Sequence, residues 1–160
     1  MKEFVKHPVY GEIVYDESFW SGKKTLTING ATAQALSKTE FMVNDQKAQV
    51  KGNLFTGVNL YIEGETVQLS PKASWFEIAF AILPFVFLMV WGNSAALCEI
   101  FPVVGGAIGG ALGGFNGVIS LYLMKQQKAR LAKAVFGILM TVATVFIAFI
   151  LAVALLSLVG

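Results

Sequence analysis

The chain has 160 residues, of which 56 % are hydrophobic, and a net charge of +2. Its mean hydropathy is +0.66. Soluble domains contain about 45–50 % apolar residues, so the excess predicts that part of the chain lies in lipid. The small net charge excludes a basic field for nucleic acid, and we expect no nucleic-acid partner.

The charged residues divide the chain into two parts. All of the 12 basic and 10 acidic residues except Glu77 and Glu99 lie outside two long apolar regions, 73–124 and 134–160. We therefore expect an α+β membrane protein, with a β-rich domain over residues 1–70 and a transmembrane domain over residues 71–160.

The first part contains short runs in which apolar and polar residues alternate, a pattern typical of half-buried antiparallel strands. Turn residues such as Asn29-Gly30, Asn44-Asp45 and Glu63-Gly64 separate the runs. The pattern predicts a small all-β sandwich or barrel. Its expected strands lie near Gly11–Asp16, Lys23–Ile28, Thr32–Leu36, Glu40–Val43, Ala48–Val50, Val58–Ile62 and Thr66–Leu69.

Several segments of this part resemble one known family. The stretch Tyr15 to Lys24, then Leu26 to Gly30, is similar to the start of the Fas apoptosis inhibitory molecule family. Phe41 to Val43 and Leu60 to Gly64 fall where that family has later strands. The resemblance covers residues 9–70 and implies an all-β sandwich that acts as an interaction module and has no catalytic residues. That family is soluble, so the apolar second half is a departure from it.

The second part contains three apolar runs long enough to predict a three-helix transmembrane bundle. Trp75 and Trp91 flank the first run, as aromatic residues do at membrane interfaces, and the expected span is 74–92. The second span is expected at 100–124, with Pro102 in its first turn. The third is expected at 134–159.

The loop between the second and third spans carries Lys125, Lys128, Arg130 and Lys133 and no acidic residue. By the positive-inside rule this loop is cytoplasmic. We therefore expect a multi-pass protein of the cell membrane, with the β-rich domain in the cytoplasm, residues 93–99 outside, and the C-terminus outside. Since residues 1–8 contain charges and a proline, we expect no cleaved signal peptide.

Glycines form two adjacent rows on the second predicted span, each with a period of four residues. Such rows allow helix backbones to approach closely in lipid. The predicted helix-packing residues are Gly105, Gly109, Gly113 and Gly117 in one row, and Gly106, Gly110 and Gly114 in the other. The rows fit packing within one chain or a dimer, assembly of several copies around a central axis, or a slot for a lipid or cofactor.

The residues offer little catalytic chemistry. His7 and Cys98 are the only histidine and cysteine, and the predicted topology puts them on opposite sides of the membrane, which excludes Cys-His catalysis and the usual zinc sites. We expect no catalytic residue, metal or cofactor, and no enzyme activity. Asn93, Glu99 and Asn116 are the polar residues in or beside the membrane, and are candidate pore or mouth residues.

These patterns favour a membrane-anchored, non-enzymatic interaction module. Its expected partners are membrane lipids and either a second copy of the chain or another protein bound through the β domain. The alternative is an oligomeric channel or transport component with the second helix near the conduction axis. Against it, the interiors of the second and third spans contain no charged residue.

Overall fold

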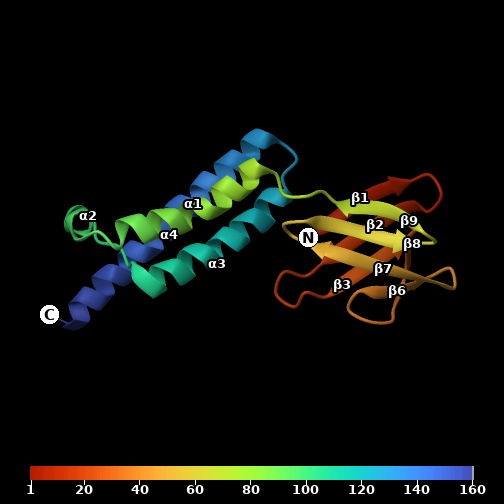
Figure 1. Ribbon diagram of the computed structural model, residues 1–160, viewed down its shortest axis with the longest axis horizontal. Helices are drawn as coiled ribbons and strands as arrows, with labels where there is room; N and C mark the ends of the chain where they lie inside the picture. Colours follow the sequence, from red (N-terminus) through yellow and green to blue (C-terminus); the bar gives the residue numbers. More distant parts are fainter. Residues whose placement is uncertain (160) are drawn as a thin grey trace. The chain divides into compact units, whose positions relative to one another are not determined.

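A computed structural model describes residues 1–159, and the chain divides into two compact units. Met1–Ala73 form the β unit, and the helical unit begins at Ser74. The β unit contains two antiparallel sheets, and the second unit is helical (Figure 1). The predicted α+β class is therefore confirmed.

The strands of the β unit follow one another as antiparallel neighbours. One sheet has four strands, β1 (Lys2–His7), β2 (Gly11–Glu17), β3 (Lys24–Ile28) and β4 (Ala31–Thr32). The other has five, β5 (Gln34–Ala35), β6 (Glu40–Val43), β7 (Gln46–Asn53), β8 (Gly57–Ile62) and β9 (Glu65–Ser70). Ala33 alone carries the chain from β4 to β5, and its N–H donates to Leu26 O.

Alternation along the strands puts apolar side chains into the core of the β unit. Ile13 and Tyr15 on β2, Leu26 on β3, Val50 on β7 and Leu60 on β8 are fully buried. Each is two residues from the next inward position on its strand, as the two-residue period of a strand requires. The core is therefore supplied by both sheets.

The β unit differs from the sequence expectation in two places. Residues 2–7 form β1, which the pattern did not predict, because Phe4 points outward with 65 % of its surface exposed. The strand expected over Thr32–Leu36 is instead two short strands in different sheets, β4 and β5. The chain passes from one sheet to the other at Ala33, and the alternation of apolar and polar residues does not reveal such a change.

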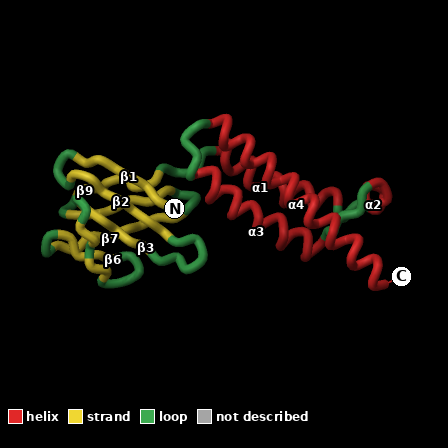
Figure 2. The backbone as a smooth tube through the Cα atoms, turned by 180° about the vertical axis from the view of Figure 1, so that it is seen from behind, coloured by secondary structure: helices red, strands yellow, loops and turns green. Residues whose placement is uncertain are grey.

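Three of the four helices, α1 (Trp75–Trp91), α3 (Gly106–Lys125) and α4 (Arg130–Val159), contact one another and run side by side (Figure 2). The short helix α2 (Ala95–Ile100) lies between α1 and α3 in the sequence. By length and hydropathy, α3 and α4 can each cross a membrane, and α1 is a shorter apolar helix of 17 residues.

The expected second span, 100–124, begins later than predicted. Residues 95–100 form the separate helix α2, and Pro102 lies before α3 rather than in its first turn. The intervening segment packs into the helical unit, since Val104 N–H donates to Ala148 O and the Phe101 ring stacks on Phe149. Continuous hydropathy across residues 100–104 concealed this break.

Candidate functional site

The first glycine row of α3 lies against α1 of the same chain. A β-carbon on Gly113 would lie 2.6 Å from Phe85 Cα, and one on Gly117 would lie 2.3 Å from Ala81 O. At the start of α3, a β-carbon on Gly105 would lie 2.0 Å from Gly92 O. Since these neighbours are backbone atoms, no side-chain adjustment could make room for a larger residue.

Gly109 belongs to the same row but is limited mainly by its own chain. A β-carbon there would lie 2.4 Å from Val104 O, in the segment that precedes α3, and 3.6 Å from Leu88 Cβ on α1. The row formed by Gly105, Gly109, Gly113 and Gly117 therefore seats both α1 and the segment leading into α3. We call it the α1-facing row.

The second glycine row is less constrained. Added β-carbons on Gly110 and Gly114 would lie at 3.4 Å from Met89 Sδ and 3.9 Å from Phe85 Cδ2, which are side-chain atoms. Gly106 has open space around it, and its φ of +58° is the reason a glycine suits that position. This row contributes looser contacts with side chains at the edge of α1.

A glycine of α4 that was not predicted also packs on α1. A β-carbon on Gly137 would lie 2.7 Å from Phe80 Cδ1. The sequence signal was weak, because a lone glycine in an apolar helix has no repeat to distinguish it. Small residues on both α3 and α4 thus allow close approach to α1.

Asn93 connects the end of α1 with the start of α3. Its Nδ2 donates to Met89 O at 2.6 Å, and its Oδ1 accepts from Gly106 N–H at 3.2 Å. The side chain thereby satisfies a carbonyl at one helix end and an N–H at another. Its geometry gives it a role in capping helix ends.

Asn116 lies between α3 and α4, with 8 % of its surface exposed. Its Nδ2 donates to Thr144 Oγ1 and, at 3.2 Å, to Met140 O. Thr144 in turn donates to Met140 O at 2.6 Å. Ser120 lies one turn further along α3 and is 1 % exposed. Within the described residues 1–159, its Oγ is the one buried polar side-chain atom that has no hydrogen-bond partner.

A charged pair joins the first turns of α1 and α4. Glu77 is 3 % exposed, and its Oε1 accepts a hydrogen bond from Lys133 Nζ. Its Oε2 accepts from Ser74 N–H at 2.7 Å, and Glu77 N–H donates to Ser74 Oγ at 3.3 Å, which forms a capping box. The carboxylate therefore caps α1 and neutralises the lysine at the same time.

Glu99, the other predicted mouth residue, is exposed on α2 and does not meet Asn93 or Asn116 in any described hydrogen bond. It lies at an open cavity of about 450 Å³ lined mainly by apolar residues, among them Cys98, Val103 and Leu155. Cys98 Sγ lies 3.3 Å from Trp91 O. The three predicted polar residues are thus brought to three different places.

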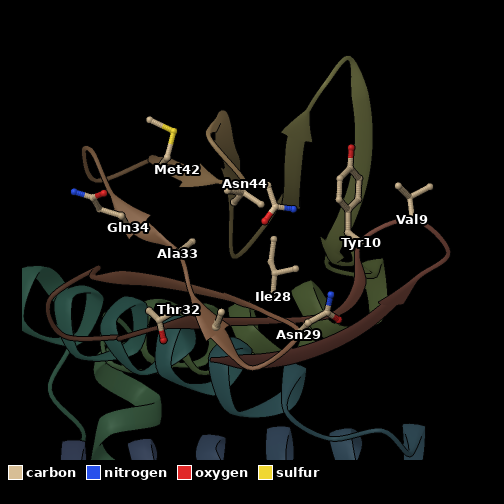
Figure 3. Close-up of a pocket in the computed structure, with 11 residues that line it drawn as sticks. Val9, Tyr10, Ile28, Asn29, Thr32, Ala33, Gln34, Met42 and Asn44 are labelled. Carbon is tan, nitrogen blue, oxygen red and sulfur yellow. The ribbon is translucent and has the colours of Figure 1, made fainter.

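A cavity of about 330 Å³ opens at one end of the β unit (Figure 3). Ends of strands and turns from both sheets surround it, with Tyr10 and Asn29 contributed by one sheet and Met42 and Asn44 by the other. Asn29 Oδ1 already accepts from Glu12 N–H at 2.9 Å. The side chains of Gln34 and Asn44 supply further amide groups at its edge.

Two buried tyrosines of the β unit are paired with carboxylates. Tyr10 OH donates to Glu63 Oε2 at 2.9 Å, and Tyr15 OH donates to Glu17 Oε2 at 2.6 Å. Burial, reinforced by the hydrogen bond and negative charge of Glu63, raises the pKa of Tyr10 to about 12. Burial and Glu17 likewise raise the pKa of Tyr15 well above its ordinary value.

Among residues 1–159, no three His, Cys, Asp or Glu side chains gather as metal ligands would. The residues that the structure brings together in the helical unit are the α1-facing glycine row, the Asn116–Thr144 hydrogen bond and the Glu77–Lys133 pair. Comparisons of the chain with protein-family models, with curated proteins and with solved structures give no match. The resemblance of residues 9–70 to the Fas apoptosis inhibitory molecule family stays a prediction.

Proposed function

We propose that this protein is a membrane-anchored, non-enzymatic interaction module. The helical unit lies in the bilayer as three spans, and the β unit binds a protein partner on the cytoplasmic side. Neither unit contributes a catalytic group to this role.

The distribution of residue types in the helical unit supports its place in lipid. Its interior contains the polar residues Glu77, Asn116, Ser120 and Thr144 beside apolar ones such as Leu88 and Leu121, and many large apolar side chains lie on its outside. In the most apolar 18-residue stretch of each helix, only 17 % of α4 and 33 % of α3 is buried. A core helix of a soluble protein has the opposite arrangement. The exposed apolar residues include Ile82, Val86, Val90, Ile108, Phe115, Val118, Val142, Phe146 and Ile150.

The ion pair agrees with the orientation inferred from the basic loop. Because Glu77 and Lys133 pair in the first turns of α1 and α4, the two helices begin at the same end of the helical unit. In this proposal α1 crosses the bilayer, α3 returns to the first side and α4 crosses again, which makes three spans. With the 125–133 segment in the cytoplasm, the β unit is cytoplasmic and α4 ends outside.

The observation that carries the anchor proposal over the channel alternative is the occupied α1-facing row. Backbone atoms of α1 fill it at Gly113 and Gly117, so this face of α3 is closed within one chain. A ring of α3 helices around a pore would have to use the opposite face, where Ile108, Phe115 and Val118 are exposed. Such large apolar side chains offer no ligand for an ion.

The cavity of the β unit is the place we assign to the protein partner. It is open, it has amide groups of Gln34 and Asn44 at its edge, and β4 and β5 beside it are short edge strands. The backbone of an edge strand can pair with an extended peptide segment, and side-chain amides beside it can bind the polar groups of that peptide.

The mass of the full chain in nanodiscs, measured by light scattering with the lipid contribution subtracted, tests the proposal. We expect one or two copies of the 17.3 kDa chain per particle, and no ion flux from liposomes that contain it. A ring of four or more copies together with ion flux would reject the anchor function in favour of the channel.

A further inference from the structure

One end of the β unit combines exposed aromatic side chains with lysines. We call it the exit end, because the chain leaves the β unit there. It consists of residues 18–24, 36–39, 53–56 and 70–73. Four observations connect these segments: Ala73 N–H donates to Phe55 O at 3.0 Å, Ser70 Oγ lies 3.7 Å from Met1 Sδ, Met1 O accepts from Glu17 N–H, and residues of 18–24 and 36–39 line one cavity.

The aromatic residues of the exit end are unusually exposed for their size. Trp20 is 81 % exposed, and its ring packs edge-on against Phe19 with centroids 5.1 Å apart. Phe55 is 46 % exposed in the turn between β7 and β8. Tryptophan and phenylalanine are favoured at the boundary between lipid headgroups and acyl chains, where the ring leaves water without losing polar contacts.

Lysines surround a second cavity at the same end. Lys23, Lys24 and Lys38 line about 300 Å³ of open space together with Ser21 and Ser37. These side chains carry ammonium and hydroxyl groups, which can donate hydrogen bonds to the phosphate of a lipid headgroup.

The two acidic residues that precede the exit end in the chain, Asp16 and Glu17, already have partners. Glu17 accepts from Tyr15 OH at 2.6 Å, and Asp16 lies 3.7 Å from the N-terminal ammonium group. The opposite end of the β unit carries Asp45, Glu63 and Glu65 together with Lys6 and Lys47. The segments of the exit end carry Lys23, Lys24, Lys38 and Lys72 and no acidic residue, so this end is positively charged.

Chain connectivity keeps the exit end close to the start of α1. Residue 73 is hydrogen-bonded to Phe55 and residue 75 begins α1, so two peptide steps of about 3.8 Å each separate them. If α1 enters the bilayer at Trp75, these two steps place the exit end within reach of the headgroups.

We propose that the exit end binds the cytoplasmic membrane surface, with Trp20 and Phe55 in the interfacial layer and the cavity of Lys23, Lys24 and Lys38 on the headgroup of an anionic phospholipid. This inference rests on the proposed membrane anchoring. Each lysine near an anionic surface contributes about a fivefold preference over a neutral one, so the interaction requires anionic lipid.

A nitroxide depth measurement on the full chain in nanodiscs tests the inference. The label is placed at Ser21→Cys in a Cys98→Ala background, in phosphatidylcholine alone and in phosphatidylcholine with phosphatidylglycerol. With phosphatidylglycerol we expect the label to be accessible to oxygen and protected from a water-soluble nickel complex. In phosphatidylcholine alone, or with Lys23→Gln, Lys24→Gln and Lys38→Gln combined, we expect it to be exposed to water.

Two further label positions separate this inference from the proposed function. Lys47→Cys at the opposite end of the β unit should remain in water in both lipids, and Val142→Cys in the middle of α4 should be immersed in both. A Ser21 label that stays in water in the anionic nanodisc while the Val142 label is immersed rejects lipid binding by the exit end alone. A Val142 label in water rejects the membrane anchor itself.

Discussion

At the residue scale, the contacts of α3 with α1 depend on the absence of a single carbon atom. Gly113 faces the backbone of Phe85, whereas Gly114, its neighbour in sequence, faces open space apart from Phe85 Cδ2 at 3.9 Å. Adjacent glycines of the same helix therefore have different tolerances. This difference could not be predicted from the sequence, where both belong to equally regular rows.

We predict that Gly113→Ala lowers the melting temperature of the full chain in detergent, because the new β-carbon would lie 2.6 Å from Phe85 Cα. Gly114→Ala is the matched control. It should leave the melting temperature unchanged or raise it, since alanine is favoured over glycine in helices by about 1 kcal/mol. Circular dichroism on heating checks both. Equal tolerance of the two substitutions would contradict the assigned packing of the α1-facing row.

We predict that Lys133→Met destabilises the helical unit by about 3 kcal/mol, because it leaves the buried Glu77 carboxylate without a positive partner. The matched control is Lys128→Met, an exposed lysine just before α4. Denaturation by sodium dodecyl sulfate in mixed micelles measures the effect. Adding Glu77→Gln to Lys133→Met should recover part of the loss, and no recovery would mean that the pair is not coupled.

The turns of the β unit were predictable because their residue types have a local cause. Asn29-Gly30, Asn44-Asp45 and Glu63-Gly64, all expected as turns, have positive φ values. By contrast, the Glu77–Lys133 pair was not predictable, since its two residues lie on helices far apart in the sequence. Local conformational preference is encoded in short segments, but the choice of partner is not.

At the element scale, α3 and α4 are joined by a polar contact in an otherwise apolar region. We predict that Asn116→Leu weakens this pairing by about 1 kcal/mol, because the bonds to Thr144 and Met140 O are lost. Ala111→Leu, at an exposed position of α3, is the control and should be neutral. Detergent unfolding monitored by circular dichroism distinguishes them.

The same variant also bears on the channel alternative. If α3 lined a conduction path, Asn116→Leu would change ion flux through liposomes that contain the protein. Under the anchor function neither the original chain nor this variant conducts. Flux that the substitution alters would therefore favour transport.

Element boundaries were predicted well where a capping signal exists and poorly where hydropathy is continuous. Ser74 and Glu77 form a capping box at the start of α1, close to the expected span of 74–92. Before α3, the apolar residues from Ile100 to Val104 continue without a polar marker, so the separate helix α2 was missed. In β1 the less exposed positions are Glu3, Val5 and His7, two of which are polar, whereas the apolar Phe4 is exposed. The strand therefore lacks the alternation of apolar and polar residues that would have predicted it.

At the scale of the whole molecule, the two units differ in the residues that their surfaces carry. Both bury apolar side chains, such as Leu26 in the β unit and Leu88 in the helical unit, but the helical unit also buries Asn116 and Ser120 and exposes large apolar residues such as Phe146. The distribution of charged residues along the chain predicts that one part lies in water and the other in lipid. The packing partner of each glycine could not be predicted, because the repeat marks only a face of the helix.

We predict that the β unit loses stability as pH rises from about 10. The folded unit keeps Tyr10 protonated to a pKa of about 12, while an unfolded chain releases that proton near the ordinary pKa of about 10. Stability from this source is therefore complete below pH 10 and is lost as pH rises through 12. Melting at pH 9 and 11, with phenolate absorbance, measures the loss. Tyr10→Phe should show a smaller alkaline loss, and an identical profile would contradict the assignment.

The pairing of Glu77 with Lys133 also has a consequence for biosynthesis. The two residues are 56 positions apart, so at about 5–20 residues per second several seconds pass between their incorporation. During that interval the Glu77 carboxylate of α1 has no lysine partner. A nascent chain that ends before Lys133 therefore leaves this carboxylate without a positive partner, so the contact between the first turns of α1 and α4 can form only after α4 has begun to emerge.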